Sequence, residues 1–244
     1  MQAKPILITG GSRGIGRAIA IRLGADGWRP LIVCRSHIKE AHEAAELSGG
    51  VACPFGADLG SLEGCRKVWE WAVSMGPVRG LVNNAGVYVQ GSFTERDERE
   101  FEASFSQAMS VNFMAPVRLS RWFAQQASKG DRILNVCSRV GFRGEAGAAA
   151  YAASKAAQIN LVRSLAVELA GLGIGVFGIA PGWVETAMTR KGMEERRAEI
   201  EGSIPLGRVA SPEDCANAAA FLLSDEAAYL SGVVLDVNGA SYFH

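Results

Sequence analysis

The chain lacks an excess of charge of either sign. Its 244 residues contain 25 Lys and Arg against 25 Asp and Glu, so the formal net charge is zero. A surface that binds nucleic acid needs clustered positive charge, and this balance argues against a nucleic-acid partner. Long apolar runs are also absent. No stretch approaches the roughly 20 residues that cross a bilayer, which argues against a membrane partner.

Features of secreted proteins are missing as well. The first residues, MQAKPILITGG, contain an apolar run that is too short for a signal peptide before glycines interrupt it. The five cysteines are an odd number, are scattered, and form no CxxC pair. Such cysteines indicate neither a disulfide framework nor a metal site, and they are typical of a reducing compartment. We therefore expect a cytoplasmic protein without a metal.

What the sequence does contain is a regular alternation of short apolar runs and longer amphipathic segments. The apolar runs span 4–9, 30–35, 51–59, 78–86, 131–138, 174–182 and 232–239. The amphipathic segments span 17–27, 37–50, 61–76, 97–128, 149–173 and 211–225. Continuous apolar strands that alternate with helices predict an α/β fold, with a parallel sheet covered on both faces. No linker or repeat divides the chain, so we expect a single domain over 1–244.

The first apolar run leads into a glycine-rich turn, TGGSRGIGRAIA at 9–20. Gly10, Gly14 and Gly16 lie between a predicted strand and a predicted helix. Glycine lets the backbone approach a ligand closely, and a helix N-terminus attracts phosphate. Loops collect glycine in any case, and the spacing is GxxxGxG rather than the commoner GxGxxG. The strand–turn–helix context favours dinucleotide binding.

The end of the second apolar run indicates which dinucleotide is bound. NAD sites usually place an acid here for the adenosine ribose, but the chain reads Val-Cys-Arg-Ser-His at 33–37. Arg35 stands in this stretch, and Arg13 lies within the glycine-rich turn. An arginine pairs well with a 2′-phosphate, so we predict NADP(H). The alternative is that both are solvated loop arginines; Asp58 comes too late to be the ribose acid.

The pentapeptide YAASK at 151–155 has two interpretations on its own. It is either a turn of an Ala-rich helix, or a phenol and an ammonium aimed at one spot, because positions four apart share a helix face. Six further motifs decide between them. They are TGGSRGIG at 9–16, NNAG at 83–86, Asn112 in SVNFMAP, Ser138 at a strand end, and PGWVET at 181–186, followed by a terminal DVNG. This ordered set resembles the short-chain dehydrogenase/reductase family over essentially the whole chain.

The resemblance implies a doubly wound Rossmann fold with seven parallel strands, and a catalytic tetrad of Asn112, Ser138, Tyr151 and Lys155. Lys155 would lower the pKa of Tyr151 from its usual value of about 10. Ser138 would bind the substrate carbonyl, and Asn112 would hold a water that links Lys155 to solvent. Together with the turn, the candidate cofactor contacts are Gly10, Ser12, Arg13, Gly14, Ile15, Gly16, Arg35, Ser36, Asp58, Leu59, Asn84, Ala85, Gly86, Tyr151, Lys155, Pro181, Gly182, Val184 and Thr186.

Within the family, the chain is most similar to 3-oxoacyl-[acyl-carrier-protein] reductases of fatty acid biosynthesis. The resemblance is strongest in the C-terminal part of the chain, in the segments PGWVETAMT and IPLGRVASPEDCANAAAFLLSDEAAYLSGVVLDVNGA. Candidate substrate contacts, each equally explained by packing, are Val89, Arg139, Phe142, Trp183 and Met188. Lys129 partly fits the basic dock expected for a carrier protein, whereas Leu172 departs from it. Other small ketones, sugars, quinones or steroids remain alternative substrates, and a non-catalytic NADP(H)-binding sensor or scaffold remains an alternative of another class.

Two expectations concern surfaces outside the tetrad. The segment 189–201 is highly charged. It is either a solvated helix face or part of a mobile lid over about 184–205. The family commonly pairs its two long central helices, here 97–128 and 149–171, across a two-fold axis. The resemblance therefore implies a homotetramer or homodimer.

Overall fold

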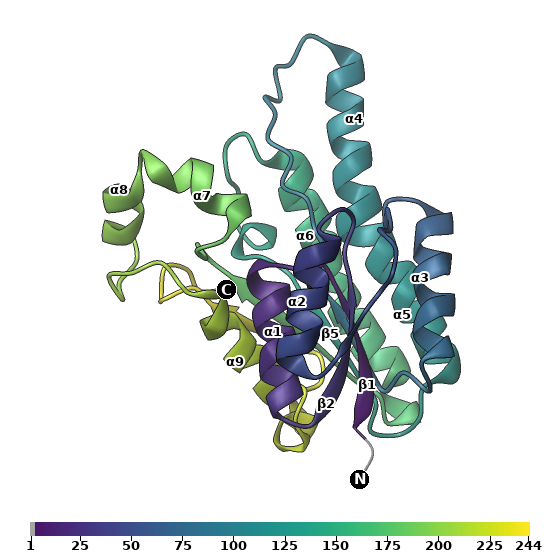
Figure 1. Cartoon of the computed structure of the whole chain (residues 1–244). Coiled ribbons are helices and arrows are strands. Elements are labelled where there is room, and N and C mark those ends of the chain that lie inside the picture. The colour runs from purple at the N-terminus through teal and green to yellow at the C-terminus, as the bar shows by residue number, and fades with distance from the viewer. Residues whose placement is uncertain (1–2) are drawn as a thin grey trace.

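The computed structural model describes residues 3–244 and contains one sheet of seven parallel strands in the order β3-β2-β1-β4-β5-β6-β7 (Figure 1). The strands are β1 (Lys4–Thr9), β2 (Trp28–Val33), β3 (Val51–Ala52), β4 (Gly80–Asn83), β5 (Arg132–Val136), β6 (Gly175–Pro181) and β7 (Val234–Val237). The strand order reverses between β1 and β4, which confirms the predicted doubly wound fold. Met1 and Gln2, which open the segment considered for a signal peptide, lie outside the described residues.

Nine α-helices and four short helical segments surround the sheet in the described part of the chain. The helices are α1 (Gly14–Ala25), α2 (Ile38–Ser48), α3 (Leu62–Ser74), α4 (Glu98–Met109), α5 (Ala115–Gln126), α6 (Ala149–Leu169), α7 (Ala187–Glu194), α8 (Arg197–Gly202) and α9 (Pro212–Leu222). The short segments are η1 (Ser110–Met114), η2 (Arg139–Gly141), η3 (Ala170–Leu172) and η4 (Asp225–Leu230). Within residues 3–244, no helix combines the length and the apolar character that crossing a membrane would require.

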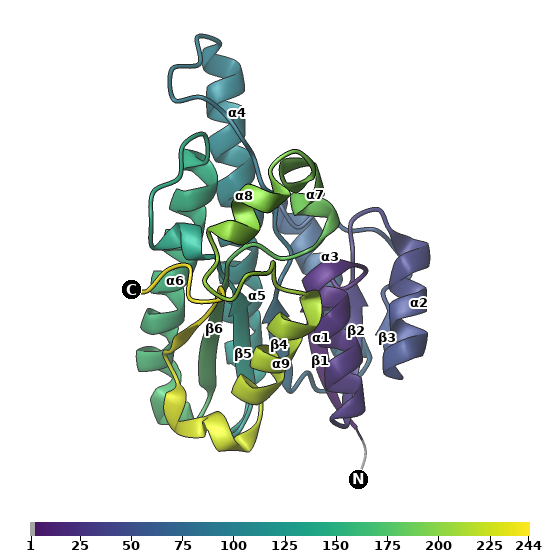
Figure 2. The same cartoon turned by 90° about the vertical axis from the view of Figure 1, so that its left-hand side faces the viewer.

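Side chains alternate between the two faces of the sheet, and each face has its own helical layer. Ile6 and Ile8 of β1 pack with α1, α2 and α9, whereas Leu7 between them packs with α3, α5 and α6. Figure 2 shows α1 and α9 side by side on the near face. All three β1 side chains are fully buried. The continuous apolar runs of the sequence therefore mark strands covered on both faces.

The third strand is much shorter than the predicted run 51–59, which is wrong beyond Ala52. Pro54 has no N–H group to give to a strand partner, and β3 is an edge strand. The chain still follows β2 around the proline. The N–H of Cys53 donates to Ile32 O at 2.8 Å, and the N–H of Ala57 donates to Cys34 O at 3.0 Å.

The predicted helical region 97–128 consists of three pieces. A π-helical turn, η1, separates α4 from α5 and carries Asn112 at its centre, fully buried. Single π turns inside α-helices are frequent at functional sites. Asp97 caps the start of α4 by accepting hydrogen bonds from the N–H groups of Arg99 and Glu100.

Candidate active site

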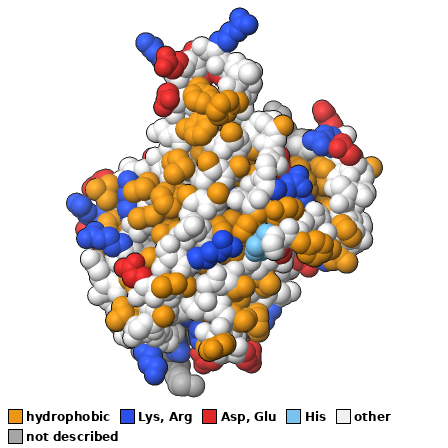
Figure 3. Space-filling view, turned by 180° about the vertical axis from the view of Figure 1, so that it is seen from behind, with side chains coloured by type: hydrophobic (Ala, Val, Ile, Leu, Met, Phe, Trp, Pro, Cys, Tyr) orange, Lys and Arg blue, Asp and Glu red, His pale blue; other side chains and the backbone are white. Residues whose placement is uncertain are grey.

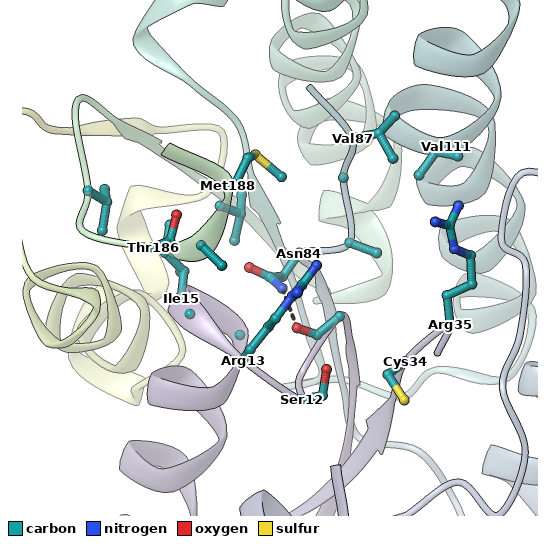
Figure 4. Close-up of a pocket in the computed structure, with 18 of the residues that line it drawn as sticks. Ser12, Arg13, Ile15, Cys34, Arg35, Asn84, Val87, Val111, Thr186 and Met188 are labelled. Carbon is teal, nitrogen blue, oxygen red and sulfur yellow. Dashed lines mark hydrogen bonds between the residues drawn. The ribbon is translucent and has the colours of Figure 1, made fainter. Parts of the chain in front are cut away.

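A cavity of about 340 Å³ opens at the carboxyl ends of the central strands (Figure 4). Its walls come from the segments that follow strands β1 to β6, from η1 and from the start of α6. It lies where the strand order reverses, which is the usual ligand site of such sheets. All nineteen candidate cofactor contacts line it, from Gly10 in the first loop to Thr186 beyond β6.

The floor of the cavity is the turn between β1 and α1. Gly10 and Gly14 have φ angles of +66° and +54°, a region that side chains other than glycine rarely adopt. Asn84 Nδ2 donates to the carbonyls of Thr9 and Gly10 at 2.9 and 3.1 Å, which ties the turn to the end of β4. No side chain caps the N-terminus of α1, where Arg13 is the first flanking residue. The N–H groups of this helix end are thus available to a phosphate.

We predict that Gly16→Ala disrupts this turn. A Cβ at Gly16 would collide with the Gly10 carbonyl oxygen and with Asn84 Nδ2. Because the Gly10 oxygen is backbone, the turn would have to open. We expect the free energy of unfolding to fall by about 3 kcal/mol, as in severe overpacking, and dinucleotide binding to weaken. Chemical denaturation and NADPH fluorescence titration measure these effects.

The control is Gly171→Ala in η3, outside the cavity, where an added Cβ would meet no atom within 4 Å. It should change neither quantity. Wild-type unfolding and binding in Gly16→Ala would show that close approach at this turn is not needed.

Two arginines reach the cavity from different walls. Arg13 precedes α1 and Arg35 follows β2, and both are exposed at its rim (Figure 4). Arg13 Nη1 lies 3.1 Å from His37 Nε2, and Ser36 Oγ lies 3.2 Å from His37 Nδ1. The end of β2 therefore presents hydrogen-bond donors and no carboxylate. His37 was not among the residues predicted from the sequence, although it stands two positions after Arg35.

Three of the four residues of the predicted tetrad line the opposite end of the cavity. Ser138 follows β5, while Tyr151 and Lys155 lie one turn apart on α6. The Lys155 side chain is 3% exposed, and its Nζ donates to Val136 O at 2.7 Å and to Gln158 Oε1 at 2.9 Å. Nζ lies 5.9 Å from the centre of the Tyr151 ring. The sequence argument also missed Gln158.

Burial dominates the acid–base properties of this pair. It raises the pKa of Tyr151 to about 12, although a hydrogen bond with Ser138 lowers it. Burial also lowers the pKa of Lys155 to about 8. The expected lowering of the Tyr151 pKa by Lys155 is not seen in this arrangement. At neutral pH the tyrosine is therefore protonated and the lysine is cationic.

Asn112 acts on the loop after β4 rather than lining the cavity. Its Oδ1 accepts from the Val87 N–H at 2.8 Å, and its Nδ2 donates to Val87 O at 2.9 Å and to Ser154 Oγ at 3.0 Å. A Cβ added at Gly86 would lie 3.3 Å from Asn112 Oδ1 and 3.8 Å from Lys155 Nζ. The missing side chain of Gly86 thus leaves a small space between the amide and the ammonium.

The candidate substrate contacts are not all brought together. Met188 lines the main cavity, whereas Val89 lines a separate small pocket under α4. Tyr88, which the sequence argument missed, packs edge-on against Tyr151 with 5.0 Å between ring centres. The only sequence signal for it is its place just after NNAG.

Arg139, Phe142 and Trp183 lie outside the walls of the main cavity. Arg139 is 6% exposed, and its Nη1 donates to Ser241 Oγ at 2.7 Å. Phe142 stacks on His244 with ring centres 3.8 Å apart. Trp183 packs against a small apolar cluster of the α7–α8 segment. All three have packing partners of their own in the described chain.

The positions considered for a carrier-protein dock lie far from this cavity along the strands. Lys129 precedes β5 and packs against Gly173, next to Leu172, after α6. Ser138 follows the opposite end of β5, and Tyr151 begins α6. Because the strands are parallel, Lys129 and Leu172 lie at the amino ends of the strands, opposite to the cavity. Within one chain they do not border the entrance, contrary to the expectation from sequence.

Comparison with known proteins agrees with this geometry. The family model described as Enoyl-(Acyl carrier protein) reductase matches residues 10–240. An acetoacetyl-CoA reductase of Allochromatium vinosum is 36% identical, covering 99% of this chain and 100% of the relative. The 3-oxoacyl-[acyl-carrier-protein] reductase FabG of Escherichia coli is also 36% identical, covering 99% and 98%.

A solved structure with bound NADP extends the comparison. It is a putative NAD(P) dependent gluconate 5-dehydrogenase from Beutenbergia cavernae, 39% identical with a TM-score of 0.88, covering 99% of this chain and 97% of its own. Sequence and fold thus agree. The chain belongs to the short-chain dehydrogenase/reductase family of oxidoreductases.

Proposed function

We propose that this protein reduces the 3-oxo group of an acyl thioester to a hydroxyl group with NADPH. One observation carries the proposal: Ser138, Tyr151 and Lys155 line the same cavity as the glycine-rich turn that fits a pyrophosphate. The relatives named for acetoacetyl-CoA and 3-oxoacyl-carrier substrates support the choice of a 3-oxo thioester.

The cofactor fits the residues at both ends of the cavity. The free N–H groups of α1 would hold the pyrophosphate. Arg13, Arg35 and Ser36 would hold a 2′-phosphate, for which the absence of an acid at the end of β2 is favourable. Lys155 and Thr186 line the end where the nicotinamide half would lie. When bound, NADPH supplies the hydride.

The side chains of the tetrad would handle the oxygen of the substrate. Ser138 donates a hydrogen bond to the carbonyl oxygen and fixes its position. Tyr151, which is protonated at neutral pH, gives its proton to that oxygen as negative charge develops. The Lys155 cation and the N-terminus of α6 stabilise the resulting phenolate. A water between Asn112 and Lys155, beside Gly86, would restore the proton.

The test is an absorbance assay of NADPH oxidation with a substrate panel. Acetoacetyl-CoA and an acetoacetyl thioester on a carrier protein should both be reduced. Because neither Lys129 nor Leu172 borders the entrance within one chain, we expect the carrier to give no more than a tenfold advantage, about 1.4 kcal/mol. Faster turnover of 5-ketogluconate, which the 39% identical structure suggests as second candidate, or of another ketone, sugar, quinone or steroid would replace the proposed substrate. Turnover of none would favour a sensor or scaffold.

We predict that kcat falls as pH rises through about 8. Lys155 is cationic below its pKa of about 8 and neutral above it, so phenolate stabilisation is lost on the alkaline side. The rate should drop about tenfold for each further pH unit, because one pKa unit is a tenfold change in population. Lys155→Arg keeps the charge at all these pH values and should remove this limb, at a lower absolute rate. A constant wild-type kcat from pH 7 to 10 would contradict the role of Lys155.

We also propose that about 184–205 acts as a lid and that the chain forms a homodimer or homotetramer. The lid assignment is supported by Met188, which lines the cavity and is 52% exposed.

The proposed association of subunits is supported by exposed apolar side chains near α4 and on α6. α4 projects from the body (Figure 1), and Figure 3 shows apolar side chains gathered below its charged tip. Phe93, whose ring packs against Phe101 of α4, is 73% exposed, and Val167 on α6 is 82% exposed. Light scattering should give at least twice the mass of the chain.

A further inference from the structure

A row of buried neutral polar side chains crosses the sheet and ends at the Lys155 ammonium. Lys155 Nζ donates to Gln158 Oε1 at 2.9 Å, and Gln158 Nε2 donates to Asn135 Oδ1 at 3.4 Å. Asn83 Nδ2 donates to the same Asn135 oxygen and to Ser120 Oγ, both at 3.2 Å. None of these side chains is more than 3% exposed. The row joins α5, β4, β5 and α6.

The ammonium sets the direction of every amide in this row. A lysine ammonium has three donors and no acceptor, so the Gln158 atom that faces it must be the oxygen. The Gln158 nitrogen then faces Asn135, which must present its own oxygen, and Asn83 must present its nitrogen. This direction leaves Asn83 Oδ1 and Asn135 Nδ2 without a partner among the described residues. Buried polar atoms are rarely left without a hydrogen-bond partner. Here the ammonium fixes the orientation of the amides, and that orientation leaves these two atoms unpaired.

Gln158 occupies a place where a carboxylate would be the usual partner. Two of the three Lys155 N–H groups are taken, by Val136 O at 2.7 Å and by Gln158 Oε1, which leaves one for Tyr151 and a cofactor. No acid of the described chain contributes to the charge state of Lys155, for which burial and Cys137 are the causes. A carboxylate at 158 would hold the ammonium more tightly. It would also cancel the positive field at Tyr151.

We propose that Gln158 is a positioning residue: its neutral carboxamide, oriented by Asn135, anchors the Lys155 ammonium without neutralising it. The anchor keeps the lysine charged in a buried site and leaves one N–H group free for the reaction. This inference rests on the proposed roles of Tyr151 and Lys155.

The other groups around the ammonium are few. On its own helix it faces Tyr151. From β5 it faces the Cys137 thiol, whose pKa burial raises to about 12. From the loop after β4 and from η1 it faces Gly86 and the neutral Asn112. The nearest charged groups act on the neighbours of Lys155: Glu145 affects the pKa of Tyr151, and Arg163 affects the pKa of Cys137. Below pH 10, Gln158 is thus the partner whose replacement should shift the pKa of Lys155.

The test is the pH dependence of kcat in Gln158→Met and Gln158→Glu. Met keeps the length of the side chain but accepts only weakly, so the alkaline limb should move down by about one pH unit. Glu should move the limb up by at least about one unit and lower kcat at pH 7 about tenfold, because it pairs with the lysine. Asn160→Met, an exposed amide on the same helix, is the matched control and should change nothing. NADPH titration and melting curves confirm that each variant is folded.

The results separate this inference from the function on which it rests. A uniform loss of kcat in both variants, with the alkaline limb unmoved, would show that Gln158 only packs the helix and would overturn the inference. If Tyr151→Phe retains turnover, the proposed chemistry itself fails. Should neither variant fold, the ¹⁵N-labelled wild type decides. A Lys155 ammonium anchored by Gln158 gives a slowly exchanging side-chain resonance that titrates near pH 8, and its absence would overturn the anchor.

Discussion

Replacing Tyr151 by Phe should lower the rate of carbonyl reduction at least about 1,000-fold while NADPH binding is nearly unchanged. The hydroxyl is the only group that the change removes, and general acids contribute about 10² to 10⁴ in rate. The Tyr151 ring would keep its packing against Tyr88. Single-turnover absorbance at 340 nm measures the chemical step, and NADPH fluorescence titration measures binding.

The neighbouring ring supplies the control for this experiment. Tyr88→Phe removes a hydroxyl from the same cluster, and burial raises the pKa of Tyr88 as it does that of Tyr151. Of the two, however, only Tyr151 lies on the wall of the cavity, together with Ser138. Tyr88→Phe should therefore retain most of the activity. Equal losses in the two variants would remove Tyr151 from its role as the proton donor.

Replacing Arg13 and Arg35 together by Ala should lower kcat/KM for NADPH by about 100-fold and leave the value for NADH nearly unchanged. Hydrogen bonds to a charged group contribute roughly 1.5 kcal/mol or more each, and about 3 kcal/mol in total corresponds to roughly 100-fold. NADH has no 2′-phosphate, so the loss of the two arginines should not change its binding. Steady-state kinetics with both cofactors measure the ratio.

Arg66→Ala is the matched control, since Arg66 is an exposed arginine of α3 that does not line the cavity. It should leave the NADPH to NADH ratio unchanged. Equal losses with NADH and NADPH in the double variant would indicate general damage to the turn instead of loss of a phosphate contact. His37, which contacts Arg13, is then the next residue to replace.

The fold was largely predictable from local patterns in the sequence. Apolar runs such as 4–9 correspond to strands because a strand covered on both faces needs apolar side chains at every position. The turn at 9–20 was predictable because glycines there permit backbone conformations that few other residues adopt. The spacing of Tyr151 and Lys155 placed both on one helix face, and both line the cavity.

The rest depends on contacts between segments distant in sequence. Gln158 looks like an ordinary polar residue of α6, and only the fold places it against Asn135 on β5. The π turn at 110–114 has no local sequence signal. Strand 51–59 was predicted too long because its apolar residues follow β2 without forming a regular ladder past Pro54. Lys129 and Leu172 were predicted to lie near the entrance because of their positions in the sequence. The direction of β5 instead places them at the end of the sheet opposite to the cavity.

The π turn also has a consequence for the length of the segment that joins α4 to α5. Because a π turn holds one residue more than an α turn, deleting one residue from η1 would give a continuous α-helix in which α5 keeps its rotational phase. Leu119 and Phe123, both fully buried against the sheet, would stay there. The contacts of Asn112 with Val87 and Ser154 depend on the wide turn and would be lost. The extra residue in this segment is thus a requirement of the site and not of the core.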